Sequence, residues 1–505
     1  MRSIPSHLAR LILPFLPAAL IISFIHLSFA TRLTNFMPFY DVDQYIYWHE
    51  MATYAHSGFN GGYYGVNELI SPLKGFGPHG VGIITIYGIM YRLMPWFGFA
   101  AIPVFNLILL TAALAAYIWI MRPKLGESLA VTLAITLHPM VFLYLPTSFQ
   151  EGFHYAAAVL LAMVFIRLIE KRDEPDMSAF RLMAGLFLLM LCFVRYTWAL
   201  CFLPYFYIIL SKKRWRLPLA FVMTVVVSLG IVKFFNLFVP AWYTSLNSGL
   251  NPTGTLLTDK IGFVLKQALS NIHTLLNFAD NKAATAVLAG ILFFLLLAAL
   301  VTFRSSSWKR GQVSSGSVIL LLVAGNIAGL MGIFILTWTG SGSHLVRLLS
   351  ANYILCFIVT FHFFPRRMFH LLVAYNAALF PLYMGIFQVY HLPGYINDEP
   401  RFTIQTFAKQ VGPYLEASSV SSPWDKTIFV DVPERGLAYL GIPAGFGIQT
   451  GVGKTNDAPR FSRFALLSTP PTDTDGRRWA PIQATDIGTL YINSPSPAPG
   501  RAPTP

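Results

Sequence analysis

Residues 101–121 read AIPVFNLILLTAALAAYIWIM, contain no charged side chain, and are followed at once by Arg122 and Lys124. An α-helix rises about 1.5 Å per residue, so a segment of this length covers the roughly 30 Å hydrocarbon core of a bilayer. Apolar segments that end in Arg and Lys are typical of transmembrane helices whose basic ends face the cytoplasm. Because this pattern recurs along the chain, it indicates a multispanning membrane protein.

The overall composition supports this class. Of the 505 residues, 55% are hydrophobic and 11% are charged, whereas a soluble domain carries roughly 25% charged residues. Much of the net charge of +14 lies in short basic clusters between apolar segments, which is the pattern of cytoplasmic loops. We therefore expect a lipid bilayer as partner, and no nucleic acid.

The order of the basic clusters sets the expected topology. If every apolar segment crossed, starting from an N-terminus inside, residues 122–124 and the strongest cluster, residues 212–216, would lie outside. Treating residues 80–97 as a surface or re-entrant helix places all clusters in the cytoplasm. The sequence therefore predicts an all-α polytopic membrane fold with about eleven transmembrane helices and a C-terminus outside. The apolar segments lie near residues 8–30, 80–97, 101–121, 128–146, 154–170, 180–196, 197–211, 217–240, 284–303, 317–337, 344–363 and 370–392.

Two apolar segments need a separate interpretation. Residues 8–30 are longer than the ~7–15 residue apolar region of a signal peptide, which favours an uncleaved first span. Cleavage after Ala30 is the alternative. Residues 180–211 are too few for two full-length spans, so we expect two short or tilted helices broken at Arg195.

The composition changes sharply after His391, which indicates a domain boundary. We interpret residues 1–392 as a transmembrane domain, in which residues 31–100 form a first external loop with juxtamembrane helices. A small external α/β domain is expected at residues 393–493, and residues 494–505, rich in Ser, Pro and Ala, are expected to be disordered. Within that domain the sequence predicts an amphipathic helix at residues 401–415 and strands at residues 427–432, 464–468 and 489–493.

Polar side chains recur at those segment ends that the predicted topology places outside. Asp41 and Asp43 lie in the run FYDVDQYIYWHE, residues 39–50. Carboxylates can accept a proton from an acceptor hydroxyl, and arginine can neutralise a phosphate leaving group. The other polar residues of this face are His79, Glu151, His154, Arg195 and Arg347.

Each acidic candidate also has a structural interpretation. Asp41 and Asp43 could act as a base, with Asp41 ranked first, or could cap a helix that begins near Gln44. Their Asp-x-Asp spacing leaves open a divalent cation that bridges to a phosphate, although two acids alone make an incomplete site. Glu151 could act in the site or cap the span that follows it.

The basic and aromatic candidates divide in the same way. Arg347 and Arg195 could bind a donor phosphate, or Arg347 could extend to lipid headgroups, and Lys233 has the same two interpretations. His79 and His154 could bind substrate, or could pack against neighbouring groups. Tyr45 and Tyr47 could stack on a sugar ring or belong to an interfacial aromatic belt. For the tyrosines, the sequence favours neither interpretation over the other.

Three features follow one another along the chain: the run YDVDQYIY at residues 40–47, a Gly-Pro-His helix start at residues 77–79, and a further external acid at Glu151. With the long first external loop, they resemble the GT-C class of integral membrane glycosyltransferases. The resemblance is to the bacterial branch related to protein O-mannosyltransferases and lipid A aminoarabinose transferases. As an architecture it covers about residues 8–370.

This resemblance implies a polyprenyl-phosphate-linked sugar donor and an inverting transfer to the hydroxyl of a glycan, lipid or protein on the external face of a bacterial inner (plasma) membrane. It assigns the catalytic acid to Asp41, and Arg347 corresponds in kind to a late external arginine that contacts the lipid phosphate. Such enzymes carry an Asp-Glu pair, where this chain has Val42 and Asp43.

Two other functions remain as alternatives. A membrane transporter of a small or lipid-linked solute would predict ionisable residues at mid-bilayer depth and internal repeats, whereas the acids here lie at span ends and no clear repeat is seen. A lipid-linked saccharide ligase or polymerase would predict a catalytic cluster in a late external loop. The leading prediction is therefore a membrane glycosyltransferase.

Overall fold

The computed structural model describes most of the chain, and Asp41, His79 and residues 495–505 of the predicted tail lie outside the described residues. Ser494, which was expected in that tail, is instead the last residue of a strand. The described ranges are 6–38, 43–66, 76, 80–210, 215–235, 237, 257–276, 282–305, 314–337, 342–364, 367–388, 398–416, 426–450, 462–471 and 478–494.

By its internal contacts the chain divides into two compact units. The first, which we call the helical unit, comprises Met1–Asn35, Ile102–Asn236 and Ala241–Leu392. The second, which we call the sheet unit, comprises Phe36–Ala101, Leu237–Pro240 and Pro393–Pro505. The first loop, which the sequence interpretation grouped with the spans, thus packs with the C-terminal segment.

Most of the candidate membrane-spanning helices belong to the helical unit, and together they indicate an integral membrane protein. Among the described residues, eight helices are long and apolar enough to cross a bilayer, together with four shorter apolar ones. The mostly helical fold is therefore confirmed, while the number of about eleven crossings stays a prediction. The long candidates are His7–Phe29, Pro95–Met121, Glu151–Glu170, Arg216–Phe234, Ala284–Phe303, Ser315–Leu336, Leu345–Phe363 and Phe369–Ile386, and the shorter ones are Val81–Leu93, Leu125–Thr136, Ser178–Val194 and Tyr196–Ile209.

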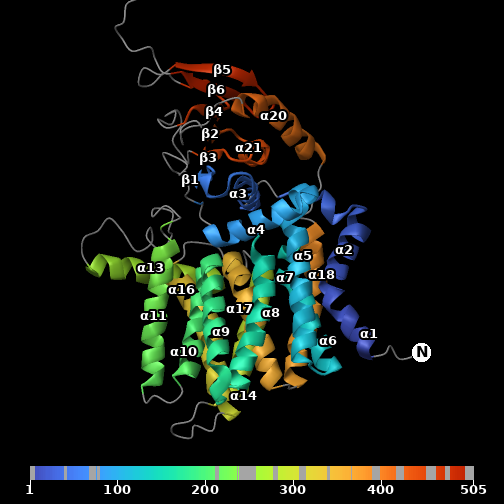
Figure 1. Cartoon of the computed structure of the whole chain (residues 1–505), viewed down its shortest axis with the longest axis vertical. Helices are drawn as coiled ribbons and strands as arrows, with labels where there is room; N and C mark the ends of the chain where they lie inside the picture. Colours follow the sequence, from blue (N-terminus) through green and yellow to red (C-terminus); the bar gives the residue numbers. More distant parts are fainter. Residues whose placement is uncertain are drawn as a thin grey trace, which may run out of the picture. The chain divides into compact units, whose positions relative to one another are not determined.

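Most α-helices of this unit are labelled in Figure 1. Their bounds are α1 Ser6–Ile12, η1 Leu13–Phe15, α2 Leu16–Phe29, η2 Leu33–Asn35, α5 Ala101–Ala116, η5 Tyr117–Met121, α6 Leu125–Thr136, α7 Pro139–Tyr144, α8 Glu151–Glu170, η6 Pro175–Met177, α9 Ser178–Val194, η7 Tyr196–Cys201, α10 Phe202–Ile209, α11 Arg216–Phe235, α13 Leu257–Leu276, α14 Lys282–Ser305, α15 Ser315–Val323, η9 Ala324–Gly329, α16 Leu330–Thr337, α17 Gly342–Phe363 and α18 Arg367–Ile386.

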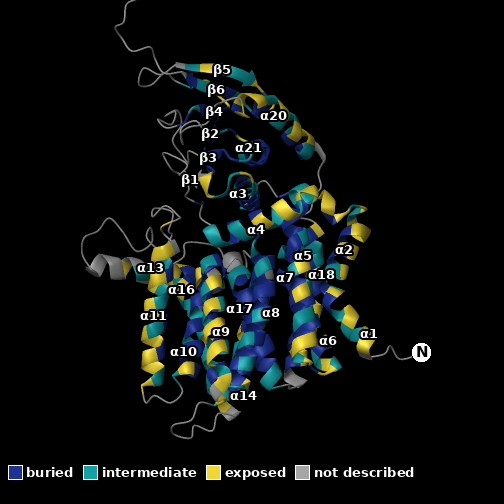
Figure 2. Cartoon of the chain, viewed as in Figure 1, coloured by how far each residue is buried: buried dark blue, intermediate teal, exposed yellow. Residues whose placement is uncertain are grey.

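Helices α8 and α17 form the centre of the helical unit. They pack against each other, and 78% of the apolar part of α8 and 83% of that of α17 is buried, against 17% for α11. Figure 2 shows the difference, with α8 mostly buried and α11 largely exposed. The run Ala156, Ala157 and Ala158 lets α8 approach its neighbours closely, because small side chains allow tight helix packing in membranes.

The predicted break at Arg195 is confirmed. Helix α9 ends at Val194 and the 3₁₀ helix η7 begins at Tyr196, with Arg195 between them in extended conformation (φ −154°, ψ 115°). Its backbone N–H still donates to the carbonyl of Leu191 at 2.9 Å, and its carbonyl accepts from the amide of Trp198 at 3.1 Å. The chain therefore turns at this residue without losing the hydrogen bonds of its two peptide groups.

The sheet unit is built on one six-stranded sheet in the order β1-β3-β2-β4-β6-β5. The first four strands in this order are parallel, and β6 and β5 run antiparallel to their neighbours. The predicted strands correspond to β2, β4 and β6 and the predicted amphipathic helix to α20, whereas β1, β3 and β5 were not predicted. The bounds are α3 Gln44–Ser57, η3 Gly58–Asn60, β1 Tyr64–Val66, α4 Val81–Leu93, η4 Pro95–Ala100, α20 Asp398–Glu416, β2 Thr427–Asp431, α21 Arg435–Gly441, β3 Gly447–Thr450, β4 Phe464–Leu467, β5 Arg478–Ala484 and β6 Thr489–Ser494.

Strand β1 joins the first loop to the C-terminal segment. Tyr64 is in register with Ile448 of β3, and the amide of Gly62 donates to the carbonyl of Gly445 at 3.2 Å. A Cβ at Gly62 would lie 2.5 Å from the backbone nitrogen of Gly447, so only glycine allows this approach. The two segments, far apart in sequence, therefore form one sheet.

Helix α3 provides the second connection within this unit. The imidazole of His49 is 2% exposed, and its Nε2 lies 2.7 Å from the carbonyl oxygen of Phe446, which can only accept. One turn later, the hydroxyl of Thr53 accepts from the amide of Gly445 at 3.3 Å. Both contacts fasten α3 to the turn that precedes β3.

The buried His49 predicts an acid-sensitive connection. Burial lowers the pKa of His49 from 6.5 to about 4, and the hydrogen bond to Phe446 opposes this only in part. Because the folded state favours neutral imidazole, its stability is complete above pH 6.5 and falls as the pH drops toward 4, by about 3 kcal/mol in total. Amide hydrogen exchange of α3 and β3, corrected for the intrinsic rate, should show this loss of protection.

Two glutamine variants separate this effect from general acid unfolding. His49→Gln keeps a side-chain donor for Phe446 but cannot titrate, so the pH dependence between 6.5 and 4 should shrink. His56→Gln, at an exposed position of the same helix, should retain it. Equal protection of wild type at pH 7 and pH 4.5 would contradict the prediction.

Candidate functional site

Glu151 is the first residue of α8, and its carboxyl group is 1% exposed inside the helical unit. The turn before it is fixed by local hydrogen bonds: Thr147 Oγ1 donates to the carbonyl of Tyr144 at 2.7 Å and accepts from the amide of Phe149 at 3.3 Å. Asn106 of α5 donates to the carbonyl of Phe149 at 3.2 Å. These bonds set the point at which α8 begins, and a carboxylate there is favoured by the helix dipole.

Two arginines from other elements meet at one oxygen of this carboxylate. Arg347 Nε, from α17, lies 3.3 Å from Glu151 Oε1, and a terminal nitrogen of Arg195 lies 3.9 Å from the same atom. Arg195 is 5% exposed, and the side chain of Arg347 is 15% exposed. The formal charges of these three side chains sum to +1. Charges buried in a membrane protein are rare and are normally paired, as they are here.

Aromatic rings hold the Arg347 guanidinium from another direction. Its central carbon lies 4.9 Å from the ring centroid of Phe149 and 5.9 Å from that of Tyr144. Both distances fit a cation–π contact, which is stronger where water is excluded. Arg347 is thus oriented both by the carboxylate and by the turn that precedes α8.

His154 and Trp198 connect the Arg195 break to α8. Trp198 Nε1–H donates to His154 Nδ1 at 3.1 Å, and His154 Nε2 faces Gln150 Oε1 at 3.3 Å. Since Nδ1 accepts, a neutral imidazole carries its proton on Nε2 and donates it to Gln150. His154 is fully buried, so its contacts are those of a positioning residue for η7 and, through it, for Arg195.

The remaining predicted residues lie elsewhere. Asp43, half-buried before α3, makes no side-chain hydrogen bond to cap that helix. Tyr47 is buried and the ring of Tyr45 lies 4.9 Å from that of Tyr439, so both pack within the sheet unit. Lys233 is exposed in the last turn of α11. Asp41 and His79 lie outside the described residues.

The sequence interpretation did not include Tyr144, Phe149 or Trp198. Phe149 stands two residues before Glu151, and Trp198 three residues after Arg195, so their proximity to chosen residues could have suggested them. Aromatic residues are common in all spans of this chain, however, and nothing in the local pattern separates these three from ordinary packing residues.

Within the part of the chain that the structure describes, no three His, Cys, Asp or Glu side chains gather in a way that could hold a metal ion. A cation between Asp41 and Asp43 stays a proposal because Asp41 is not in that part.

Comparison with models of known protein families and with curated proteins gives no match. Function is therefore inferred from the residues and from the geometry of the site.

Gly152 offers a test of how the site is positioned. A Cβ there would lie 2.6 Å from three side-chain atoms of Asn106, so Gly152→Ala should push α8 and α5 apart and cost about 1–3 kcal/mol. Thermal unfolding of the purified protein measures the loss. Gly230→Ala is the matched control, since a Cβ at that helical position meets nothing within 4 Å. Equal unfolding temperatures for the two variants would contradict the close approach.

Proposed function

We propose that the protein is an integral membrane glycosyltransferase that moves a sugar from a polyprenyl-phosphate-linked donor to an acceptor hydroxyl, with inversion at the anomeric carbon. The observation that supports this most is the buried cluster of Glu151, Arg195 and Arg347. Two guanidinium groups held at one carboxylate oxygen form a paired cationic site among apolar helices. Such a site suits a phosphate group that arrives attached to a lipid.

In this proposal the arginines act on the leaving group. As the bond between the anomeric carbon and the phosphate oxygen breaks, negative charge grows on the polyprenyl phosphate. Guanidinium groups already fixed in place stabilise that charge without reorganising, and their effect is larger where water is excluded. Arg347 is oriented by the carboxylate and by the rings of Phe149 and Tyr144.

The geometry favours a positioning role for Glu151. Its carboxylate already faces two guanidinium groups, so taking a proton from an acceptor would remove the charge that holds both arginines. The base is therefore assigned to Asp41, with Asp43 as second choice, on the sequence alone. The acceptor oxygen attacks the anomeric carbon, its proton passes to the Asp41 carboxylate, and the sugar–phosphate bond breaks.

The acceptor class stays open between a glycan, a lipid and a protein, and the external face of a plasma membrane remains the expected location. A divalent cation at Asp41 and Asp43 is an alternative means of neutralising the phosphate. Transport is the rival function, because buried ionisable residues also line solute pathways in transporters. A lipid-linked saccharide ligase or polymerase would use the same donor chemistry.

If Arg347 stabilises the phosphate leaving group, its loss should impair catalysis with the lipid-linked donor. Arg347→Gln should lower kcat/KM for a polyprenyl-phosphate-linked sugar roughly a hundredfold, since truncating a buried charge pair costs about 2–5 kcal/mol. Arg347→Lys keeps the charge but loses the planar guanidinium with its paired donors. Its kcat/KM should therefore lie between that of Arg347→Gln and that of wild type. Arg32→Gln, at an exposed position, is the control. Sugar transfer by reconstituted, folded protein is the assay, and unchanged kinetics in Arg347→Gln would remove the arginine from the site.

The base assignment predicts a different defect. Asp41→Asn should lower the rate of sugar transfer by a factor of at least about 10², while binding of the lipid-linked donor persists. Full activity in that variant would exclude Asp41 as the base. Solute movement across liposomes by the wild-type protein, without glycosyl transfer, would favour the transporter instead, and activity that survives chelation of divalent cations would exclude the metal.

A further inference from the structure

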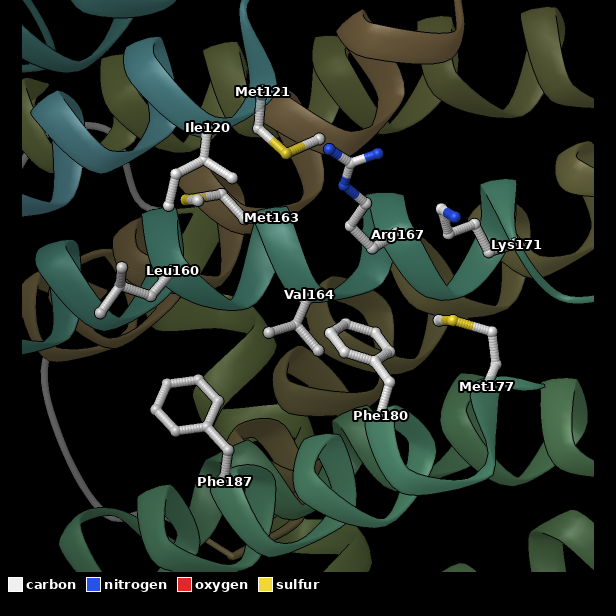
Figure 3. Close-up of a pocket in the computed structure, with 10 residues that line it drawn as sticks. All are labelled: Ile120, Met121, Leu160, Met163, Val164, Arg167, Lys171, Met177, Phe180 and Phe187. Carbon is white, nitrogen blue, oxygen red and sulfur yellow. The ribbon is translucent and has the colours of Figure 1, made fainter. Parts of the chain in front are cut away.

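A second feature of the helical unit is an apolar cleft of about 580 Å³ on its outer side. Helix α8 forms its floor between η5 and α9, and packs against both. Figure 3 shows Ile120 and Met121 on one side of α8 and Phe180 and Phe187 on the other. The cleft runs from Leu160 to Lys171, about 16 Å at the helical rise, which is close to half of a bilayer's hydrocarbon core.

The side chains that line this cleft have an uneven distribution of charge. Among the described lining residues, only Arg167 and Lys171 are charged. They lie one turn apart at the C-terminal end of α8. The other lining residues are Ile120, Met121, Leu160, Met163, Val164, Met177, Phe180 and Phe187. The cleft is therefore an apolar channel with two basic side chains at one end.

Nearby acids hold these basic groups only weakly. Arg167 pairs with Glu170 at 3.4 Å and Lys171 with Glu174 at 3.0 Å, with all four side chains at least one-third exposed. Exposed pairs of this kind contribute little to stability and leave the side chains able to reorient. Glu170 is also shared with His362 of α17, at 3.0 Å. A phosphate in the cleft could therefore compete for Arg167 and Lys171.

The walls are adaptable. Ile120 and Met121 belong to the π-helical turn η5, a feature that often marks functional sites in helices. Met121, Met163 and Met177 contribute flexible, polarisable side chains that fit irregular apolar shapes. Apart from the two basic groups, the described lining residues offer no polar side chain, so the cleft suits a hydrocarbon chain better than a peptide, whose backbone would need hydrogen-bond partners.

We propose that this cleft binds one anionic phospholipid, with an acyl chain along α8 and the phosphate between Arg167 and Lys171. Basic pockets between transmembrane helices are where anionic headgroups are recognised. The lipid is separate from the donor of the proposed reaction, and its site involves none of the residues around Glu151.

The test uses full-length protein stripped of lipid in detergent, with bound lipid counted by native mass spectrometry. When each is added to the stripped protein, dioleoyl phosphatidylglycerol should bind, whereas dioleoyl phosphatidylcholine and inorganic phosphate should not. Arg167→Gln should weaken binding about fivefold, the effect expected for one basic residue near a headgroup. Lys124→Gln, an exposed basic residue outside the cleft, is its charge-matched control.

A second pair of variants tests the acyl channel. Val164→Trp should fill the cleft and reduce retention of the lipid, whereas Leu182→Trp, at an exposed position of α9 outside the lining, should leave retention unchanged. Equal binding of the two phospholipids, equal binding of inorganic phosphate, or equal losses in both tryptophan variants would overturn the proposal. So would a change in oligomeric state in Val164→Trp alone, because the cleft would then be an interface between copies.

Discussion

The helical unit depends on one electrostatic constraint: the carboxylate of Glu151 cannot be buried among apolar helices without cations beside it. Arg347 and Arg195 meet that requirement at one oxygen. Because these arginines come from α17 and from the break between α9 and η7, the constraint fixes three elements relative to one another. The most buried pair of helices, α8 and α17, is the pair that this contact joins.

The residues around this cluster hold its charged side chains in place. Trp198 and His154 hold the helix break, while Asn106 and Thr147 fix the turn before α8. A guanidinium stabilises developing charge only if it is already in place, so these neutral contacts are part of the proposed chemistry. Removing Glu151 would leave two guanidinium groups buried without their carboxylate, which couples the fold of this unit to its proposed function.

Sequence patterns predicted the features that depend on local composition. Apolar length identified the candidate spans, the shortage of residues around Arg195 indicated the break, and short apolar runs in the polar C-terminal segment located β2, β4 and β6. Glu151, Arg195 and Arg347 were chosen separately for their charge, and the structure brings them together. Pairings between distant segments left no local pattern: Tyr64 beside Ile448 could not be inferred from either stretch. For the same reason the acidic-aromatic run left Tyr47 open between a sugar-stacking and an interfacial role, whereas the structure buries it within the sheet unit.

The pairing of β1 with β3 restricts the path of the chain through the bilayer. A bilayer cannot divide a sheet, so the chain must return before β2 to the side on which it left β1, after an even number of crossings. Of the eight long candidates among the described residues, seven follow β1 and precede β2. Seven is odd. If all seven cross and the count is kept to the described helices, an odd number of the four shorter apolar ones, Val81–Leu93, Leu125–Thr136, Ser178–Val194 and Tyr196–Ile209, must cross as well. Adding the last three of these to the seven gives ten, an even number. Under that condition, the pairing of the three-residue strand β1 implies that at least one of the shorter described helices takes part in spanning the membrane.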